Sequence, residues 1–283
     1  MKWRGGRTGG NVEDRRGAKG AAAGGGIGIV IIALIGYFFF GIDPQTTTKI
    51  AGGLSNIGGG EQAGEVGTPE DEAGRFVDVV GANVNDVWSQ AMQGYREPTV
   101  VLYTQGTSTG CGYGQSAMGP FYCPTDQTVY LDLSFWSEME SKLGASGAEF
   151  ARAYVVAHEF GHHVQTLTGA SQAVRKAQQS ASSQAEANRH LVKLELQADC
   201  YAGVWAANAA RVSGGQVKLE AGDMREGLKT ANAIGDDTLQ KRSTGQVQPE
   251  GFTHGTSEQR MEWLTRGYET GDPNSCDTFS ALD

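Results

Sequence analysis

The sequence predicts an α+β fold in which a small β-sheet precedes two long helices that carry polar, chemically active residues. Runs rich in β-branched and aromatic residues at 98–103 and 129–136 predict strands. Apolar residues recur at helical spacing over 148–169 and 190–205, which predicts two helices. A third observation is an uncharged, largely apolar stretch at 20–42, which sets an N-terminal region apart from this domain.

The N-terminal region has the charge pattern of a membrane anchor. Residues 1–19 contain six basic and two acidic residues, and the uncharged stretch 20–42 would span about 34 Å as a helix, enough to cross a bilayer. The apolar core is not followed by a convincing small-x-small cleavage site, which favours an uncleaved anchor over a signal peptide. By the positive-inside rule, we expect residues 1–19 to be a basic cytoplasmic tail, 20–42 a transmembrane helix, and the rest of the chain to lie outside the cytoplasm.

The remaining chain divides into a linker and a domain. Residues 43–74 are rich in Gly, Thr and Glu and predict a flexible linker. Residues 75–283, roughly 200 positions, suffice for one hydrophobic core. The net charge of the whole chain is −9 despite the basic tail, which argues against nucleic acid as a partner because phosphate binding requires a basic surface.

The two strands have a predicted role beside the site. Val129, Leu131, Leu133 and Phe135 alternate along the second run and would share one face. An exposed edge of this sheet would allow an extended peptide to add as a further strand through main-chain hydrogen bonds.

The pattern H-E-x-x-H occurs at His158, Glu159 and His162, inside the first predicted helix. Positions i and i+4 of a helix lie one turn apart on the same face, so both imidazoles can bind one zinc ion. Zinc lowers the pKa of a bound water to about 7, and Glu159 would accept its proton as a general base. The alternative is an amphipathic helix whose histidines are merely solvated, which is disfavoured because three of the five histidines lie within 158–163. His163 points about 100° away from His162 and is expected to pack rather than bind metal.

A catalytic zinc site normally has three protein ligands and one open position. No third histidine follows His162 at the metzincin spacing, so the remaining ligand must come from elsewhere. Glu195 and Asp199 lie one turn apart on the second predicted helix. We expect Glu195 to bind zinc and Asp199 to accept the far N–H of a ligand imidazole, although a solvated surface carboxylate is the alternative for Glu195.

Three motifs together resemble one family. They are H-E-F-G-H-H-V-Q at 158–165, E-L-Q-A-D-C-Y-A-G at 195–203 and T-H-G-T-S-E-Q-R at 253–260. This set resembles the bacterial putative neutral zinc metallopeptidase family, whose members are small and membrane-anchored. The resemblance implies a zincin-like catalytic domain with gluzincin-style ligands and one catalytic Zn²⁺.

His254 is the expected donor to the oxyanion of a tetrahedral intermediate. It precedes a predicted helix start at which Thr256 and Gln259 form a capping box, so a structured loop would hold it. An exposed loop histidine is the alternative, and similarity to thermolysin-type enzymes favours the functional assignment.

Four cysteines fit an oxidising compartment. Cys111 and Cys123 flank a Gly-rich loop and are expected to form one disulfide, which leaves Cys200 and Cys276 as the second pair. A cysteine zinc knuckle is less plausible, because the chain has no C-x-x-C.

The sequence thus predicts a membrane-anchored zinc peptidase that acts on peptides or proteins in the periplasm or outside the cell. The alternative from another class is a zincin-fold binding or assembly factor with a structural zinc and no proteolysis. Glu159 argues against the alternative, because a structural zinc site does not need this carboxylate.

Overall fold

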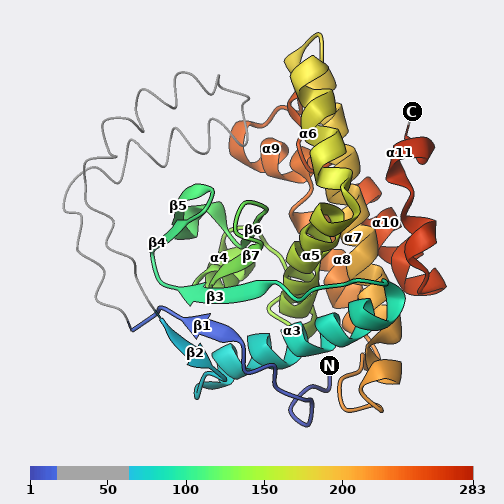
Figure 1. The fold of residues 1–283 in the computed structure, drawn as a ribbon. Helices are drawn as coiled ribbons and strands as arrows, with labels where there is room; N and C mark the ends of the chain where they lie inside the picture. Colours follow the sequence, from blue (N-terminus) through green and yellow to red (C-terminus); the bar gives the residue numbers. More distant parts are fainter. Residues whose placement is uncertain (18–63, 283) are drawn as a thin grey trace.

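Five short strands form a mixed sheet in the order β2-β1-β3-β7-β6 (Figure 1). The three inner strands are mutually parallel, and the two edge strands are antiparallel to their neighbours. A separate hairpin joins β4 and β5. The strand bounds are β1 Val12–Asp14, β2 Glu65–Gly67, β3 Thr99–Tyr103, β4 Gly106–Thr109, β5 Gly112–Gln115, β6 Phe121–Cys123 and β7 Thr128–Asp132.

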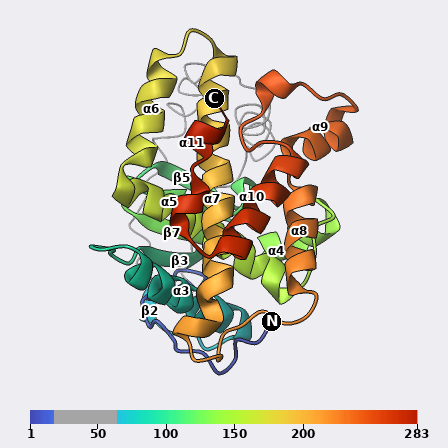
Figure 2. The same ribbon diagram turned by 90° about the vertical axis from the view of Figure 1, so that its right-hand side faces the viewer.

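Helices make up most of the remaining fold in this computed structural model, which describes residues 1–17 and 64–282. Their bounds are α3 Glu72–Ala91, α4 Phe135–Ser141, α5 Glu149–Thr168, α6 Ala170–Ser180, α7 Gln184–Val212, α8 Asp223–Ala233, α9 Asp236–Thr244, α10 Ser257–Thr270 and α11 Thr278–Ala281, with short 3₁₀ turns at η1 Ser116–Met118, η2 Pro249–Gly251 and η3 Pro273–Cys276. In Figure 1, α5 and α7 lie side by side next to the sheet, and Figure 2 shows α10 and α11 packed across α7.

The inner strands β3 and β7 are buried on both faces along most of their length. Val100, Leu102, Val129 and Leu131 belong to the main core, which they share with α3, α5 and α7. The intervening residues of β3 and β7 form a second, smaller cluster on the opposite face. Because side chains on both faces of β3 and β7 are buried, consecutive residues in these strands are apolar, and apolar residues do not simply alternate with polar ones.

Two glycines bring helices unusually close together. A Cβ at Gly161 of α5 would lie 3.1 Å from the Cα of Ala198, so its absence lets α7 approach the middle of α5. A Cβ at Gly267 of α10 would overlap the carbonyl oxygen of Cys200 on α7. These contacts fix α5, α7 and α10 relative to one another, and all three helices contribute to the site described below.

The N-terminal residues are part of the same fold. Val12 of β1 pairs with Val100 of β3 on one side and with Gly67 of β2 on the other. Trp3 and Val12 are buried in the main core. The structure therefore corrects the separate tail predicted for residues 1–19, because the described residues 1–17 supply an inner strand of the domain's sheet.

The domain also begins before residue 75, the boundary predicted from the sequence. Residues 64–74, assigned to the linker 43–74, form β2 and the start of α3, where Asp71 caps the helix by accepting from the N–H of Gly74. The transmembrane helix predicted at 20–42 and most of the linker lie outside the described residues. Among the described residues, no helix is both long and apolar enough to span a bilayer.

The second predicted strand ends earlier than expected. It was predicted to continue to Trp136, whereas β7 ends at Asp132 and Phe135 begins α4. The side chain of Asp132 accepts a hydrogen bond from the N–H of Ser134, which turns the chain out of the sheet. Phe135 therefore does not share the strand face with Val129.

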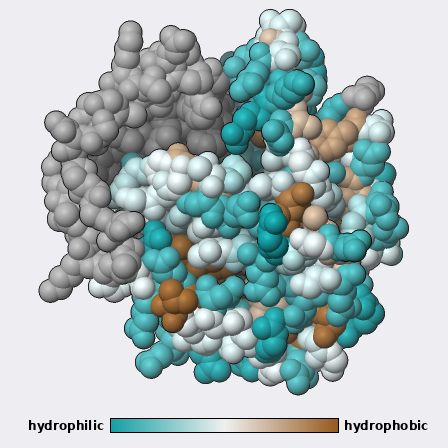
Figure 3. Space-filling model, viewed as in Figure 1, coloured by the Kyte–Doolittle hydropathy of each residue, from teal (hydrophilic) through white to brown (hydrophobic). Residues whose placement is uncertain are grey.

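Both predicted disulfides are confirmed. Cys111 bonds to Cys123, which ties the β4–β5 hairpin to the edge strand β6, and Cys200 bonds to Cys276, which ties η3 to α7. The face shown in Figure 3 is mostly hydrophilic, with apolar side chains in small separate groups.

Candidate metal centre

The helix α5 is buried along most of its length and carries the H-E-x-x-H motif near its middle. Only 7% of His158 and 6% of Glu159 are exposed to solvent. The helix ends as predicted at Gly169, whose φ of 84° is readily adopted only by glycine. The motif is thus held by a packed helix and not by a mobile loop.

Three side-chain atoms from α5 and α7 converge on one point. The Nε2 atoms of His158 and His162 lie 3.1 Å apart. The Oε2 atom of Glu195 lies 3.2 Å from the first and 3.4 Å from the second. The sequence-predicted ligand set is therefore brought together, and it is the one such cluster of His, Cys, Asp or Glu within residues 1–17 and 64–282.

The hydrogen bond made by the Nδ1 atom of each imidazole determines whether its Nε2 atom carries a hydrogen or a lone pair. His158 Nδ1 lies 2.8 Å from Asp199 Oδ1, and His162 Nδ1 lies 2.9 Å from Gln165 Oε1. A carboxylate or amide oxygen can only accept, so each Nδ1 carries a hydrogen in the neutral ring. Each Nε2 then directs a lone pair toward the other ring and toward Glu195.

This convergence of lone pairs fits a zinc ion. Three ligands at about 2.05 Å from a tetrahedral zinc are separated from one another by about 3.3 Å. The observed separations of 3.1, 3.2 and 3.4 Å match this value. Two imidazoles and one carboxylate are also a donor set that zinc binds readily in enzymes.

The charges of the cluster favour a cation at its centre. Burial alone would lower the pKa of His158, but Asp199 and Glu195 outweigh it and raise that pKa to about 10. Burial likewise opposes ionisation of Glu195, yet the neighbouring histidines hold its pKa well below the ordinary range. Two carboxylates therefore attract positive charge to this point, and a metal would compete with protons for it.

Asp199 belongs to a buried network that sequence reasoning recognised only in part. Its Oδ1 accepts from the Tyr154 hydroxyl at 2.6 Å as well as from His158. Arg260 of α10 donates to both oxygens of Asp199, from Nε at 2.8 Å and from Nη2 at 2.9 Å. Arg260 was noted only as part of a motif, and its role could not be recognised because its partner is 61 positions away.

The Glu159 side chain is largely buried, and none of the described residues donates a hydrogen bond to its carboxylate. Burial raises the pKa of this carboxyl. His162 and His158 oppose this rise in the pKa of Glu159, and Glu195 adds to it. Glu159 directly follows His158 on α5, which keeps it next to the cluster in sequence.

His254 lies on the loop before α10, as expected, and the capping box of Thr256 and Gln259 is confirmed. Asp236 holds this loop: its Oδ2 accepts from the backbone N–H groups of His254 at 2.6 Å and Gly255 at 3.1 Å. Asp236 Oδ1 is also 3.5 Å from His254 Nδ1. Burial opposes protonation, but Glu195 and Asp236 raise the pKa of His254 overall. Sequence analysis missed Asp236, which looks like an ordinary first-turn acidic residue of α9.

His163 points away from the cluster, as expected. Its Nε2 lies 2.6 Å from the carbonyl oxygen of Arg96, and its Nδ1 lies 3.0 Å from the hydroxyl of Tyr122 on β6. The residue therefore joins α5 to the edge of the sheet and takes no part in the metal cluster.

Comparison of the sequence with known proteins identifies the family to which the chain belongs. The family model described as "Putative neutral zinc metallopeptidase" matches residues 1–279, and the chain belongs to this family. Uncharacterized protein YpfJ of Escherichia coli K12 is 46% identical over 99% of both chains. Uncharacterized protein Rv2575 of Mycobacterium tuberculosis is 46% identical over 75% of this chain and 74% of its own length. No solved structure matched the chain.

Proposed function

We propose that this chain is a zinc-dependent peptidase of zincin-like architecture, with one catalytic zinc held by His158, His162 and Glu195. The observation that carries the proposal is the convergence of these three ligands beside Glu159, a buried carboxylate with no protein partner among the described residues. A purely structural zinc site would not need that carboxylate, which argues against the binding-factor alternative.

Each residue then has a defined task. Zinc bound there would lower the pKa of a coordinated water to about 7 and polarise a substrate carbonyl. Glu159 acts as the general base, accepting a proton from water and passing it to the leaving amine. His254, oriented by Asp236, donates a hydrogen bond to the developing oxyanion. Asp199 keeps His158 in the tautomer that offers Nε2 to the metal.

The edge of the sheet supports a peptide as substrate. Strand β6 ends the described sheet next to α5, to which Tyr122 and His163 connect it. An extended peptide can add to such an edge through main-chain hydrogen bonds, which demand little of its sequence. The disulfide at Cys123 holds the β4–β5 hairpin beside this edge.

The proposal includes a location outside the cytoplasm at the cell membrane. Two disulfides within 283 residues are typical of exported proteins. The apolar stretch 20–42 supports membrane association.

The test uses the full-length protein, because residues 1–17 contribute to the fold. Zinc content and cleavage of a mixed peptide library are measured for the wild type, His158→Ala, Glu195→Ala and Glu159→Gln. We expect the two alanine variants to lose zinc, and Glu159→Gln to keep it while kcat/KM falls about 100- to 10,000-fold. Unchanged zinc content in Glu195→Ala would refute the ligand set, and zinc-loaded wild type that cleaves no peptide would refute the peptidase.

A further inference from the structure

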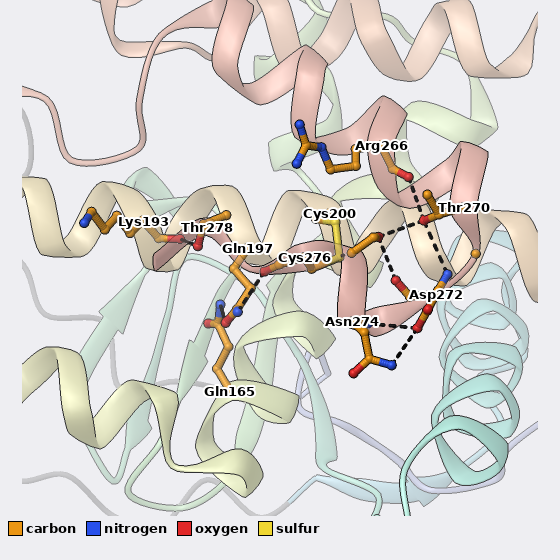
Figure 4. Close-up of a disulfide and its surroundings, with 12 residues drawn as sticks. Gln165, Lys193, Gln197, Cys200, Arg266, Thr270, Asp272, Asn274, Cys276 and Thr278 are labelled. Carbon is orange, nitrogen blue, oxygen red and sulfur yellow. Dashed lines mark hydrogen bonds between the residues drawn. A yellow bond between two sulfur atoms is a disulfide. The ribbon is translucent and has the colours of Figure 1, made fainter. Parts of the chain in front are cut away.

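A chain of buried polar groups connects the second histidine of the cluster to a disulfide. His162 Nδ1 lies 2.9 Å from Gln165 Oε1, and the Nε2 of Gln165 donates to Gln197 Oε1 at 3.2 Å. Gln197 Nε2 in turn donates to the carbonyl oxygen of Cys276 at 3.0 Å. Figure 4 shows Gln165 of α5 next to Gln197 of α7, with Gln197 linked to Cys276 beside its disulfide to Cys200.

The hydrogen-bond partners of Gln165 and Gln197 allow each side-chain amide only one orientation. Gln165 Nε2 also donates to the carbonyl oxygen of Leu194 at 2.6 Å, so both of its hydrogens are used on acceptors. Its oxygen must then face His162 and can only accept. Because Gln197 donates to the Cys276 carbonyl, its own oxygen is turned toward Gln165. The carbonyl oxygens of Leu194 and, through Gln197, of Cys276 therefore fix the Gln165 amide that sets the tautomer of His162.

Burial makes this orientation costly to change. Gln165 is 0% exposed and Gln197 is 7% exposed. Rotating either amide would turn its oxygen toward another acceptor and its NH₂ group toward another donor, which leaves buried polar groups unsatisfied. The arrangement plays the same part for His162 that the Asp199 carboxylate plays for His158.

The anchoring carbonyl belongs to the last segment of the chain. η3 and α11 follow the end of α10, and the disulfide holds them on α7 across 76 positions of sequence. Thr278 adds one hydrogen bond at 2.6 Å to the carbonyl of Lys193. Removal of the disulfide would let η3 move away from α7, and Gln197 would lose a fixed acceptor.

We infer that Gln165, Gln197 and the Cys200–Cys276 disulfide are a positioning relay for the metal centre. The relay fixes the His162 ring so that Nε2 faces His158 and Glu195, and it makes tight zinc binding depend on disulfide formation. The inference rests on the proposed metal site, but not on which reaction that site catalyses.

The test compares zinc affinity in four full-length proteins. They are the wild type, Gln197→Met, the Cys200→Ala/Cys276→Ala pair and, as a matched control, the Cys111→Ala/Cys123→Ala pair. Zinc affinity is measured by competition with a chromophoric chelator, and the absorption spectrum of the cobalt-substituted protein reports ligand geometry. Unfolding of the metal-free proteins is followed in parallel.

We expect zinc binding to weaken about 10- to 100-fold in Gln197→Met and in the Cys200/Cys276 variant, with altered cobalt spectra in both. The control pair, whose disulfide contacts no metal ligand, should bind zinc as the wild type does. Wild-type zinc affinity in Gln197→Met would overturn the relay, even if the Cys200/Cys276 variant fails to fold. A zinc-binding wild type without peptidase activity would refute the proposed reaction and leave this result standing.

Discussion

Replacing Arg260 with methionine should destabilise the metal-free protein by about 3–5 kcal/mol, because it leaves a carboxylate buried without its counter-ion. Asp199 is 0% exposed and Arg260 is 4% exposed, so solvent cannot take over the lost charge. Two charge-assisted hydrogen bonds to Asp199 would be lost, together with one to Tyr154 and one to the carbonyl oxygen of Ile234. Methionine keeps much of the side-chain volume, which limits the contribution of a cavity.

The effect should also depend on pH in a defined direction. Burial opposes ionisation of Asp199, but Arg260 and His158 hold its pKa below the ordinary value. A lowered folded-state pKa contributes stability at pH values above about 4, and this contribution is lost as the pH falls below it. The difference between wild type and Arg260→Met should therefore shrink as the pH falls below about 4.

The assay is chemical denaturation followed by circular dichroism, with a chelator present so that zinc binding does not contribute. Arg266→Met is the matched control, since Arg266 lies on the same helix but pairs with Glu262 at the exposed surface. That control should change stability by less than about 1 kcal/mol. A loss below about 1 kcal/mol in Arg260→Met, or a loss equal to that of the control, would refute the buried-network argument.

Three further outcomes are expected. Zinc affinity should rise with pH toward about 10, because zinc displaces the proton that His158 binds with a raised pKa, and calorimetry in buffers of different ionisation enthalpy should detect proton release. Gly267→Ala should cost about 1–3 kcal/mol in thermal or chemical unfolding, because the added methyl overlaps the carbonyl of Cys200; wild-type stability would contradict this close crossing. His254→Ala should keep zinc and lower kcat/KM about 100-fold, and Asp236→Asn should lower it less; unchanged peptide cleavage in both would remove His254 from the mechanism.

The convergence of His158, His162 and Glu195 could largely be predicted because helical spacing converts directly into three-dimensional proximity. His158 and His162 are one turn apart, and the spacing of Glu195 and Asp199 on a second helix made their shared direction visible in the sequence. Residues that act through these ligands were harder to recognise. Gln165 resembles any polar residue near a helix end, and its importance depends on which atoms of α7 lie opposite it.

The sheet was predicted less completely than the helices. The runs around β3 and β7 are apolar because both of their faces are buried. Strand β1 has only three residues, two of them acidic, so its side-chain pattern does not predict a strand. Its extended structure depends on backbone pairing with β2 and β3. The two edge strands, β2 and β6, are equally short, so no alternation was long enough to detect.

Strand β1 also constrains how the chain can be arranged around a bilayer. Neighbouring strands exchange backbone hydrogen bonds, so β1, β2 and β3 must occupy the same compartment. Asp14 and Glu65 face each other across β1 and β2, so these two positions must lie on the same side of any bilayer. A fragment that starts at residue 75 would expose the backbone of β3 along one edge, and purification of this protein should therefore begin from the full chain.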